Sequence, residues 1–587
     1  MFDQAQELLQ KYYGYSSFKM GQAKVIDSLL NGIDTLAIMP TGAGKSVCYQ
    51  IPSMIFEGVT LVISPLIALM KDQVDGMAAF GISATFINSS LRRSEVSRRL
   101  EEAGQGKFRL VYVAPERLEL PEFLELAQTL NVSFVAIDEA HCISQWGHDF
   151  RPSYKRIPKF ISSLNQRPVL GAFTATATGE IQKDIVKLLD FKTPQVFVSG
   201  FDRENLFFAV VRGENKKDFV LDYVRSSKEK SGIIYAATRR EVDNVYELLR
   251  GKGYLCSKYH AGMNDKEREA SQEAFIHDNA LVMVATNAFG MGIDKSNVRY
   301  VLHYNMPKNM EAYYQEAGRA GRDGEPGECI LLFGAQDVLL QKFMIEETVY
   351  SPIRKKNEYH KLQTIIDYCH TSRCLRQYIL EYFGELEAPS QCARCGNCTD
   401  DSEMNNITLD AQKILSCVVR VKGRYGAGLI AEILKGSKNK KVLQLRFDKL
   451  STYGLMEEYT LQEIKDLINL LAAEGYLTLT EGEYPVVKLG RKAPAVLKGS
   501  EEVWQRRRKK REVREDDILF EKMRQLRKEI AEREGVPPYI VFPDSTLREL
   551  CDRLPLNRDS MLKAKGVGQI KMERFGGEFL QLIREHE

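Results

Sequence analysis

Short apolar strands alternate with helical stretches through the first 340 residues of the chain. Apolar strands separated by helices of about ten or more residues form parallel sheets that are covered on both faces. The pattern therefore predicts an α/β fold with two tandem parallel-sheet lobes, which meet near Gly200. The predicted strands are Thr35–Met39, Val59–Ser64, Arg109–Ala114, Phe134–Asp138 and Val169–Thr174, then Gly232–Ala236, Leu281–Ala285, Tyr300–His303 and Cys329–Leu332.

The pattern changes after residue 340. Helices lead into a cysteine-rich turn, and three further helical stretches precede a predicted hairpin of Gly475–Leu479 and Val486–Leu489, as in a winged helix. The last region is helical, with breaks at Val536-Pro537-Pro538 and Gly566-Val567-Gly568. The predicted segments are 1–200, 201–340, 341–402 (cysteine-rich module), 403–498 (winged helix), 499–516 (basic linker) and 517–587 (small all-α domain).

Composition narrows the class of protein only slightly. The chain has 587 residues, 44% of them hydrophobic, and no apolar run is long enough to span a bilayer. The first residues lack a basic segment followed by an apolar one, so we expect no secretory signal and a soluble cytoplasmic protein. The net charge of +3 says little, but the six residues from Arg506 to Arg511 are all basic. They form a solvated linker, the end of an exposed helix, or a phosphate contact.

A glycine-rich loop follows the first predicted strand. Its sequence is Thr41-Gly42-Ala43-Gly44-Lys45-Ser46, and the strict form of the motif has a glycine at the position of Met39. Such loops direct backbone N–H groups at phosphate oxygens, at the positive end of the next helix. Lys45 can reach the β- and γ-phosphates, and Ser46 can ligate Mg²⁺. A chance glycine turn is the alternative, which the preceding strand disfavours.

Two acidic residues end another apolar strand. Asp138 and Glu139 follow Phe134–Ile137, which places them at the carboxyl edge of the sheet, facing the glycine-rich loop. Asp138 can hold Mg²⁺, directly or through water, and Glu139 can activate the attacking water as a general base. A solvated turn is the alternative.

An arginine-bearing segment lies near the end of the second series of strands. Arg319 and Arg322 share a face if this segment is helical, and glycines flank them. Arginines directed at a γ-phosphate stabilise charge in the transition state of phosphoryl transfer. Ordinary surface ion pairs are the alternative.

Three of the eleven cysteines form a C-x2-C-x2-C run, Cys392, Cys395 and Cys398. In a cytosolic chain such clustering indicates a metal rather than disulfides, and thiolates favour Zn²⁺. A closed tetrahedral site needs a fourth ligand. Cys374, His370 and Cys369 are the upstream candidates, and their chemistry alone does not separate them.

These motifs, in this order, resemble the RecQ family of superfamily 2 DNA helicases over essentially the whole chain. The most specific match begins at Asp138-Glu139-Ala140-His141 and continues to Pro152. It resembles the DEAH box of the family and the aromatic-rich loop that couples DNA binding to ATP hydrolysis. The resemblance assigns DNA contacts to Trp146, Phe150 and Arg151. Their aromatic faces and positive charge suit unstacked bases and phosphates, although a core position for the aromatics is the alternative.

The resemblance implies further site residues. Tyr15, Lys19 and Gln22 match the adenine-recognition motif, with Lys19 where an arginine is usual. Gly292 and Asp294 match a second-lobe motif near the nucleotide, and Gln315 belongs with Arg319 and Arg322. Ser64–Gln73 is similar to a segment that touches the DNA strand, and Thr174-Ala175-Thr176-Ala177 to the motif that links the lobes. Cys374 is selected as the fourth zinc ligand.

The family also implies RecA-like lobes, a winged helix that grips duplex DNA, and a C-terminal HRDC-like domain. Lys435-Gly436-Ser437-Lys438-Asn439-Lys440-Lys441 suits phosphate contacts, or it is a solvated loop. The expected cofactors are ATP, Mg²⁺ and Zn²⁺. The expected activity is 3′→5′ unwinding of DNA in recombination, repair, replication and the SOS response. Single-strand-binding protein and repair proteins are the expected partners at the nucleoid, with no membrane contact.

Two rival functions remain. An RNA-stimulated ATPase or helicase would carry a similar motor, but the aromatic loop and the zinc and winged-helix modules disfavour it. A non-catalytic DNA-binding scaffold is disfavoured because Lys45, Asp138, Glu139 and Arg322 are all present.

Overall fold

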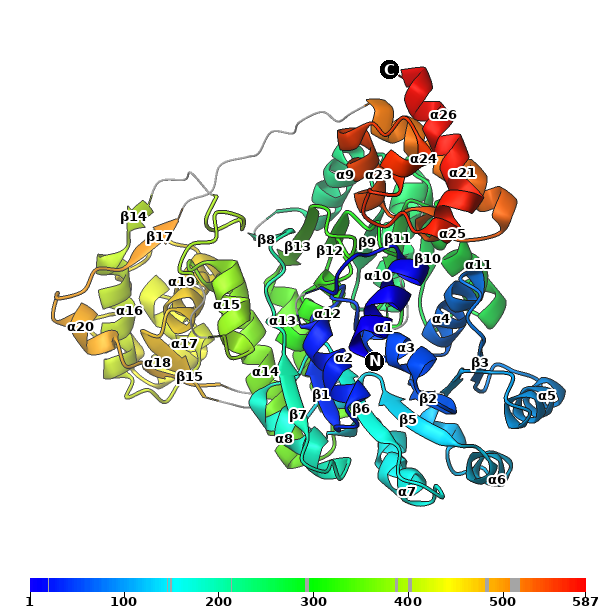
Figure 1. The fold of residues 1–587 in the computed structure, drawn as a ribbon. Helices are drawn as coiled ribbons and strands as arrows, with labels where there is room; N and C mark the ends of the chain where they lie inside the picture. Colours follow the sequence, from blue (N-terminus) through cyan, green and yellow to red (C-terminus); the bar gives the residue numbers. More distant parts are fainter. Residues whose placement is uncertain are drawn as a thin grey trace.

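The computed structural model describes the chain apart from residues 20, 145, 148–149, 213, 291–294, 386–388, 400–403, 481–484, 507–517 and 587. Two parallel sheets form the centre of the molecule (Figure 1). A helical module and a mixed module extend from one side of them, and a C-terminal helical domain returns to the sheets. None of the helices in the described ranges is both long and apolar enough to cross a lipid bilayer.

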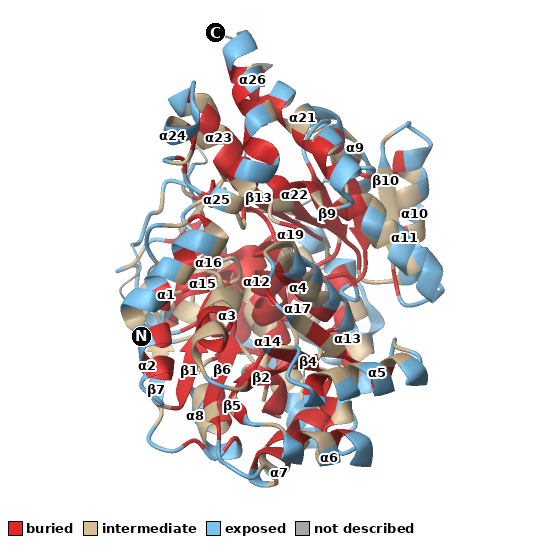
Figure 2. Cartoon of the chain, turned by 45° about the vertical axis from the view of Figure 1, so that its right-hand side comes forward, coloured by how far each residue is buried: buried red, intermediate tan, exposed pale blue. Residues whose placement is uncertain are grey.

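Lobe 1 is a parallel sheet of seven strands in the order β3-β4-β2-β5-β6-β1-β7. Its central strands are fully buried because helices cover both faces, as Figure 2 shows. Since β5, β6 and β1 are neighbours, the loops after them meet at one edge of the sheet. The strands are β1 (Thr35–Ile38), β2 (Val59–Ile63), β3 (Ala84–Ile87), β4 (Leu110–Val113), β5 (Val132–Ile137), β6 (Val169–Thr174) and β7 (Gln195–Val198).

Lobe 2 is a parallel sheet of six strands in the order β10-β11-β9-β12-β13-β8. The strands are β8 (Leu206–Arg212), β9 (Gly232–Tyr235), β10 (Cys256–Tyr259), β11 (Val282–Ala285), β12 (Tyr300–His303) and β13 (Gly327–Phe333). The two parallel sheets confirm the predicted fold class, and every strand predicted for the lobes is present. Four strands were not predicted, namely β3, β7, β8 and β10.

The helices of the lobes connect these strands. Those of lobe 1 are α1 (Phe2–Leu8), α2 (Gln22–Leu30), α3 (Lys45–Ile55), α4 (Ile67–Ala79), α5 (Arg93–Gly104), α6 (Pro121–Thr129), α7 (Ile157–Ser162) and α8 (Gly179–Leu188). Those of lobe 2 are α9 (Lys216–Ser226), α10 (Arg239–Arg250), α11 (Asp265–Ile276) and α12 (Met310–Ala317).

A helical module continues from lobe 2 through α13 (Ala335–Thr348), α14 (Pro352–His370) and α15 (Leu375–Tyr382). Its cysteine-rich loop packs on the edge strand β8, where Gly396 N–H donates to the Phe208 carbonyl at 2.7 Å. This contact occupies part of an otherwise open sheet edge.

The mixed module that follows is a separate apolar core of helices and two short antiparallel pairs. The predicted hairpin is present as β15 (Leu477–Leu479) and β16 (Val487–Leu489). In addition, β14 (Met404–Asn406) pairs with β17 (Trp504–Arg506), which lies in the predicted basic linker. The rest of the basic block falls outside the described residues. The helices are α16 (Thr408–Arg420), α17 (Ala427–Lys435), α18 (Lys440–Gln444), α19 (Leu461–Ala473) and α20 (Ala493–Leu497).

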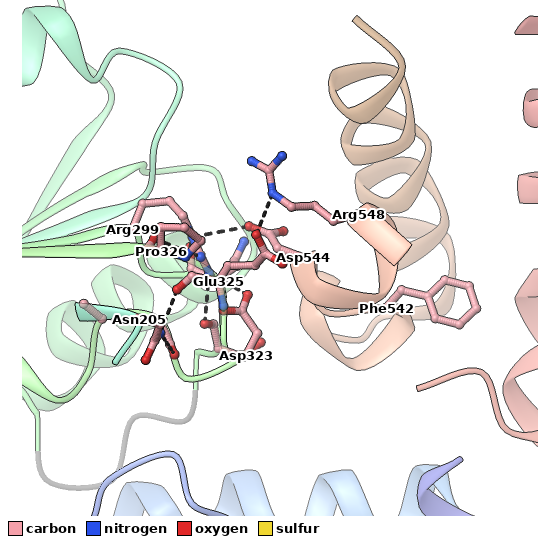
Figure 3. Close-up of polar contacts among 12 residues, drawn as sticks. Asn205, Arg299, Asp323, Glu325, Pro326, Phe542, Asp544 and Arg548 are labelled. Atoms are coloured by element: carbon pink, nitrogen blue, oxygen red, sulfur yellow. Dashed lines mark hydrogen bonds and ion pairs between the residues drawn. The ribbon is translucent and has the colours of Figure 1, made fainter. Parts of the chain in front are cut away.

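The C-terminal domain is helical, as predicted, and it docks on lobe 2 through charged side chains (Figure 3). Asp544 lies 3.5 Å from Arg299 Nε of lobe 2 and 2.7 Å from Arg527 Nη1 of its own domain. Arg548 pairs with Glu325 at 2.7 Å. The helices are α21 (Ile518–Glu534), α22 (Pro538–Val541), α23 (Asp544–Arg553), α24 (Arg558–Met561), α25 (Gln569–Lys571) and α26 (Gly577–His586).

Candidate functional site

A cavity of about 320 Å³ lies where the two lobes meet. Residues from separate segments of the chain line it, including most of the predicted nucleotide site. The predicted residues in its wall are Thr41, Gly42, Gly44, Lys45, Ser46, Asp138, Glu139, Gln315, Arg319 and Arg322. Tyr539 and Ile540 of α22 also line it, so the C-terminal domain reaches the cavity wall.

The glycine-rich loop joins β1 to α3 in a tight turn. Gly42 and Gly44 have φ values of +85° and +80°, which residues other than glycine rarely adopt. A Cβ on Gly42 would also come within 3.1 Å of Arg203 Nη1. Lys45 Nζ donates to the Met39 carbonyl at 3.1 Å, and burial lowers the pKa of Lys45. The turn therefore directs the N-terminus of α3 and one ammonium at the cavity, as a phosphate group requires.

Asp138 and Glu139 follow β5 and enter the same cavity. Burial, followed by the neighbouring Glu139 carboxylate, raises the pKa of Asp138 to about 7. Glu139 has a φ of +47° and is therefore held in a strained backbone conformation. Asp138 and the Ser46 hydroxyl supply hard oxygen donors, and a divalent cation would reverse the raised pKa of Asp138. The residues present thus fit Mg²⁺.

The acidic pair is connected to the loop after β6. His141 Nδ1 lies 2.8 Å from Thr174 Oγ1 and 3.3 Å from Glu139 Oε2. The predicted link between the lobes therefore contacts the acidic pair through His141.

The arginine segment lies in turns after α12, which ends at Ala317, and not on the helix itself. Arg319 is 5% exposed, and its Nε has no hydrogen-bond partner among the described residues. A Cβ on Gly290 would lie 2.8 Å from Arg319 Nη2, so a glycine there admits the guanidinium. A buried arginine whose Nε is unpaired among the described residues is costly, and a phosphate group in the cavity would offset that cost.

The predicted adenine-recognition residues lie against the outside of the glycine-rich loop. Gln22 Nε2 donates to the carbonyls of Ala43 at 2.9 Å and Gly44 at 3.1 Å. Lys19 Nζ donates to the Gly42 carbonyl at 3.3 Å. Burial raises the pKa of Tyr15. Gln22 and Lys19 are thus bonded to the loop through their polar atoms, whereas Tyr15 packs partly against the core of lobe 1.

The predicted DNA loop is polar and only partly buried. Phe150 is half-buried, with Lys155 Nζ 5.3 Å and the Arg354 guanidinium 5.8 Å from its ring centre. Arg151 Nη1 donates to the Pro65 carbonyl at 3.1 Å, and the Trp146 carbonyl accepts from Lys361 Nζ at 2.9 Å. Trp146 packs partly against the core. Two of the motif's predicted neighbours, His148 and Asp149, lie outside the described residues.

The predicted second-lobe residues Gly292 and Asp294 also lie outside the described residues. The segment before them ends at Gly290, beside Arg319.

Four cysteines form a candidate zinc centre. The sulfur atoms of Cys374, Cys392, Cys395 and Cys398 all lie within 4.8 Å of one another. The 3.9 Å between Cys374 and Cys395 fits the edge of a tetrahedron of Zn–S bonds, which is about 3.8 Å. A hydrogen bond from Cys374 lowers the pKa of Cys395 to about 4, which favours the thiolate. Of the three upstream candidates, it is Cys374 that lies with the C-x2-C-x2-C cysteines, as the family resemblance implied.

Arg203 is a residue of this site that the sequence pattern did not reveal. It stands just before β8, and its side chain reaches the glycine-rich loop and the arginine segment. Its sequence neighbours are polar and exposed, so hydrophobic periodicity gave no signal. A charged residue at the junction of two predicted lobes was the one available indication.

Comparison with known protein families covers almost the whole chain. The matching family models are DEAD/DEAH box helicase (residues 19–185), helicase conserved C-terminal domain (215–324), RecQ zinc-binding (335–399), RQC domain (401–514) and HRDC domain (516–583).

Similar proteins match from end to end. The ATP-dependent DNA helicase RecQ of Bacillus subtilis is 48% identical, with 100% of this chain and 99% of that protein covered. The protein of the same name from Haemophilus influenzae is 40% identical, with 99% and 96% covered. A putative ATP-dependent RNA helicase of Acanthamoeba polyphaga mimivirus is 35% identical over 83% of this chain and 90% of that protein.

The end-to-end identity and the order of the five domain matches agree with the cavity and the four-cysteine centre described above. The chain belongs to the RecQ family of ATP-dependent DNA helicases.

Proposed function

We propose that this helicase hydrolyses ATP between its lobes to move 3′→5′ along single-stranded DNA and to separate the duplex ahead. The observation that carries the proposal is that charged groups of both lobes line one cavity. Lobe 1 contributes Lys45 and the carboxylates of Asp138 and Glu139, and lobe 2 contributes Arg319 and Arg322. Phosphoryl transfer relies almost entirely on positioning and charge stabilisation of this kind.

Each residue has a distinct role in the proposal. Lys45 and the N–H groups of the glycine-rich loop hold the β- and γ-phosphates. Asp138 and Ser46 would hold Mg²⁺, which neutralises phosphate charge when bound. Glu139 takes the proton of the attacking water, and the two arginines stabilise the charge that develops on the γ-phosphate.

The adenine base is assigned to the adenine-recognition residues, whereas Gln315 belongs with Arg319 and Arg322. Gln22 exchanges its bonds to the loop carbonyls for the adenine edge, and Tyr15 stacks on the ring. Lys19 remains bonded to the Gly42 carbonyl of the glycine-rich loop. Gly292 and Asp294, which lie outside the described residues, are assigned to the nucleotide by the family resemblance alone.

DNA enters the proposal through the loop after the acidic pair. Phe150 offers an aromatic ring with two cations 5.3 and 5.8 Å from its centre, a combination that suits a stacked base and its phosphate. Arg151 is bonded to Pro65 of lobe 1, and the Trp146 carbonyl is bonded to Lys361 of α14. A DNA strand bound to this loop would therefore displace elements around the cavity. Hydrolysis should then depend on DNA.

The segment boundaries at 200, 340, 402, 498 and 516 remain part of the proposal. So do a place at the nucleoid in the cytoplasm and roles in recombination, repair, replication and the SOS response. Single-strand-binding protein and repair proteins are the proposed partners, because each of those processes exposes single strands.

ATP hydrolysis measured with and without single-stranded DNA tests the proposal, alongside unwinding of duplexes with a 3′ or a 5′ tail. Strong stimulation by DNA with unwinding from the 3′ tail alone would support the motor, its polarity and its coupling. Stimulation by RNA alone would favour the rival function that the name of the viral relative suggests. Hydrolysis at the same rate with and without either nucleic acid would overturn the role proposed for the aromatic-rich loop that carries Trp146, Phe150 and Arg151.

A further inference from the structure

Arg203 forms a bridge between the two halves of the hydrolysis site. Its Nη1 donates to the Thr41 carbonyl of the glycine-rich loop in lobe 1. Its Nη2 donates to the carbonyls of Ala320 at 3.1 Å and Gly321 at 2.7 Å in lobe 2. One guanidinium thus joins the segment that binds phosphate to the segment that carries Arg319 and Arg322.

One of the carbonyls that Arg203 binds belongs to Gly318, at the C-terminus of α12. The last carbonyls of a helix lack partners within the helix and carry partial negative charge, so a cation there is stabilising. Gly318, the first residue after α12, also accepts from Arg203 Nη1, at 3.4 Å. Because Arg319 and Arg322 follow at once, a fixed end of α12 fixes where the two arginines begin.

The lobes approach each other very closely beside this guanidinium. A Cβ on Gly42 would lie 3.3 Å from the Arg322 backbone, and one on Gly318 would lie 3.1 Å from the Thr41 side chain. Such contacts leave little slack between the lobes, so a small displacement of either segment would be felt at the other.

Arg203 is itself held by the zinc-binding module. Arg376 of α15 donates to the Arg203 carbonyl at 2.7 Å and to the Asp202 carboxylate. Its other nitrogen donates to the Leu206 carbonyl at 2.5 Å, where β8 begins. Arg376 is buried and stands two residues after the zinc ligand Cys374. The zinc-binding module therefore holds the backbone around Arg203, whereas the Arg203 side chain binds the two lobes.

We infer that Arg203 is a positioning residue for ATP hydrolysis, which holds the arginine segment against the glycine-rich loop, and that Arg376 carries this support from the zinc-binding module. The inference rests on the proposed function, because it assumes that this cavity hydrolyses ATP. It assigns Arg203 no contact with the reacting atoms. Its effect is on where Arg319 and Arg322 stand when the γ-phosphate is transferred.

Kinetics of the full chain at saturating single-stranded DNA test the inference. Arg203→Ala should lower kcat by about 10–100-fold, since misplacement of catalytic groups by about 1 Å has effects of that size. KM for ATP should stay nearly unchanged, because the interaction acts in the transition state. Arg203→Lys should recover part of the loss, since an ammonium can donate to as many as three carbonyls.

Arg117→Ala is the matched control. Arg117 is also half-buried and donates to one carbonyl, that of Asn88 at 3.0 Å, but both residues lie within lobe 1 and outside the cavity wall. A kcat for Arg203→Ala that equals that of Arg117→Ala would overturn the inference. A raised KM with an unchanged kcat would also overturn it, in favour of direct substrate binding. If Arg203→Lys is as slow as Arg203→Ala and both melt early, the role is merely structural.

Arg376→Ala tests the support from the zinc-binding module. It should lower kcat in the same direction but less, with the zinc content of the protein unchanged. The double variant with Arg203→Ala should be no slower than Arg203→Ala alone, because both changes act through one contact. Effects that multiply would remove Arg376 from the inference.

The proposed function and this inference fail in different ways. Without DNA-stimulated hydrolysis in the unmodified protein, the proposed function fails first. With that activity present and unaffected by Arg203→Ala, only the positioning role fails.

Discussion

Lobe 2 has two faces that carry buried charges, and the charges on the two faces are compensated by different partners. Toward the C-terminal domain, Arg299 pairs with Asp323 at 2.5 Å, and Arg548 pairs with Glu325 at 2.7 Å. Toward lobe 1, the guanidinium of Arg203 bonds to carbonyls, and Arg319 lines the cavity with its Nε unpaired among the described residues. Buried charges persist only where something compensates them. One face is complete within the protein, and the other is arranged for a charged ligand.

The largest expected effect comes from breaking the ligand-directed face. Arg322→Ala should lower DNA-stimulated kcat by about 10³-fold or more, because an arginine on the transferred phosphoryl group has effects of that order. Steady-state hydrolysis measures it, and binding of single-stranded DNA without nucleotide should be unchanged. A loss below about tenfold would mean that Arg322 does not reach the phosphate.

A change on the face of lobe 2 that contacts the C-terminal domain should lower stability and leave catalysis unchanged. In Asp544→Asn the charge that Arg299 and Arg527 share is lost, and breaking a buried pair costs about 3–5 kcal/mol. Although burial opposes it, those two arginines hold the pKa of Asp544 below its ordinary value. We expect the C-terminal domain to melt earlier by calorimetry, while hydrolysis at the cavity survives. Loss of both together would contradict the separation of the two faces.

The acidic side of the cavity should show a pH signature. Because the pKa of Asp138 is raised to about 7, the folded protein disfavours the carboxylate, and stability falls as pH rises from about 4 to about 7. Asp138→Asn removes this penalty. The variant should melt several degrees higher than the parent at pH 8 without Mg²⁺, and close to it at pH 4. An equal difference at both pH values would contradict the assignment.

The smallest effect is expected at the rim of the paired face. The Arg548 side chain is 38% exposed, so its pair with Glu325 is screened by solvent. Pairs of this kind contribute about 0–1 kcal/mol. Arg548→Ala should therefore leave the melting of the C-terminal domain almost unchanged, and it serves as the control for Asp544→Asn. A loss as large as that of Asp544→Asn would show that Arg548 carries the docking.

The sequence predicted the interior of the fold better than its borders. The four strands missed in the lobes, β3, β7, β8 and β10, are the four edge strands of the two sheets. Central strands are covered on both faces and read as apolar runs, whereas β7 and β10 are partly or largely exposed. An edge strand in a polar stretch resembles a loop until its neighbour is known.

The same limit applies to the site. The glycine-rich loop, the acidic pair and the cysteine run could be predicted because each is continuous in the sequence. Arg203 could not, because its partners Thr41 and Gly321 lie on either side of it at 162 and 118 residues' distance. The fourth candidate zinc ligand needed the family resemblance, since Cys369, His370 and Cys374 all lie within six residues of sequence and each can bind a metal.

The short pairing of β14 with β17 joins the beginning and the end of the mixed module, Asn406 opposite Trp504. A segment whose entry and exit lie side by side is topologically an insertion. It can be excised and replaced by a short peptide without rerouting the chain on either side. A protein shortened in this way would show which steps of unwinding proceed without the mixed module.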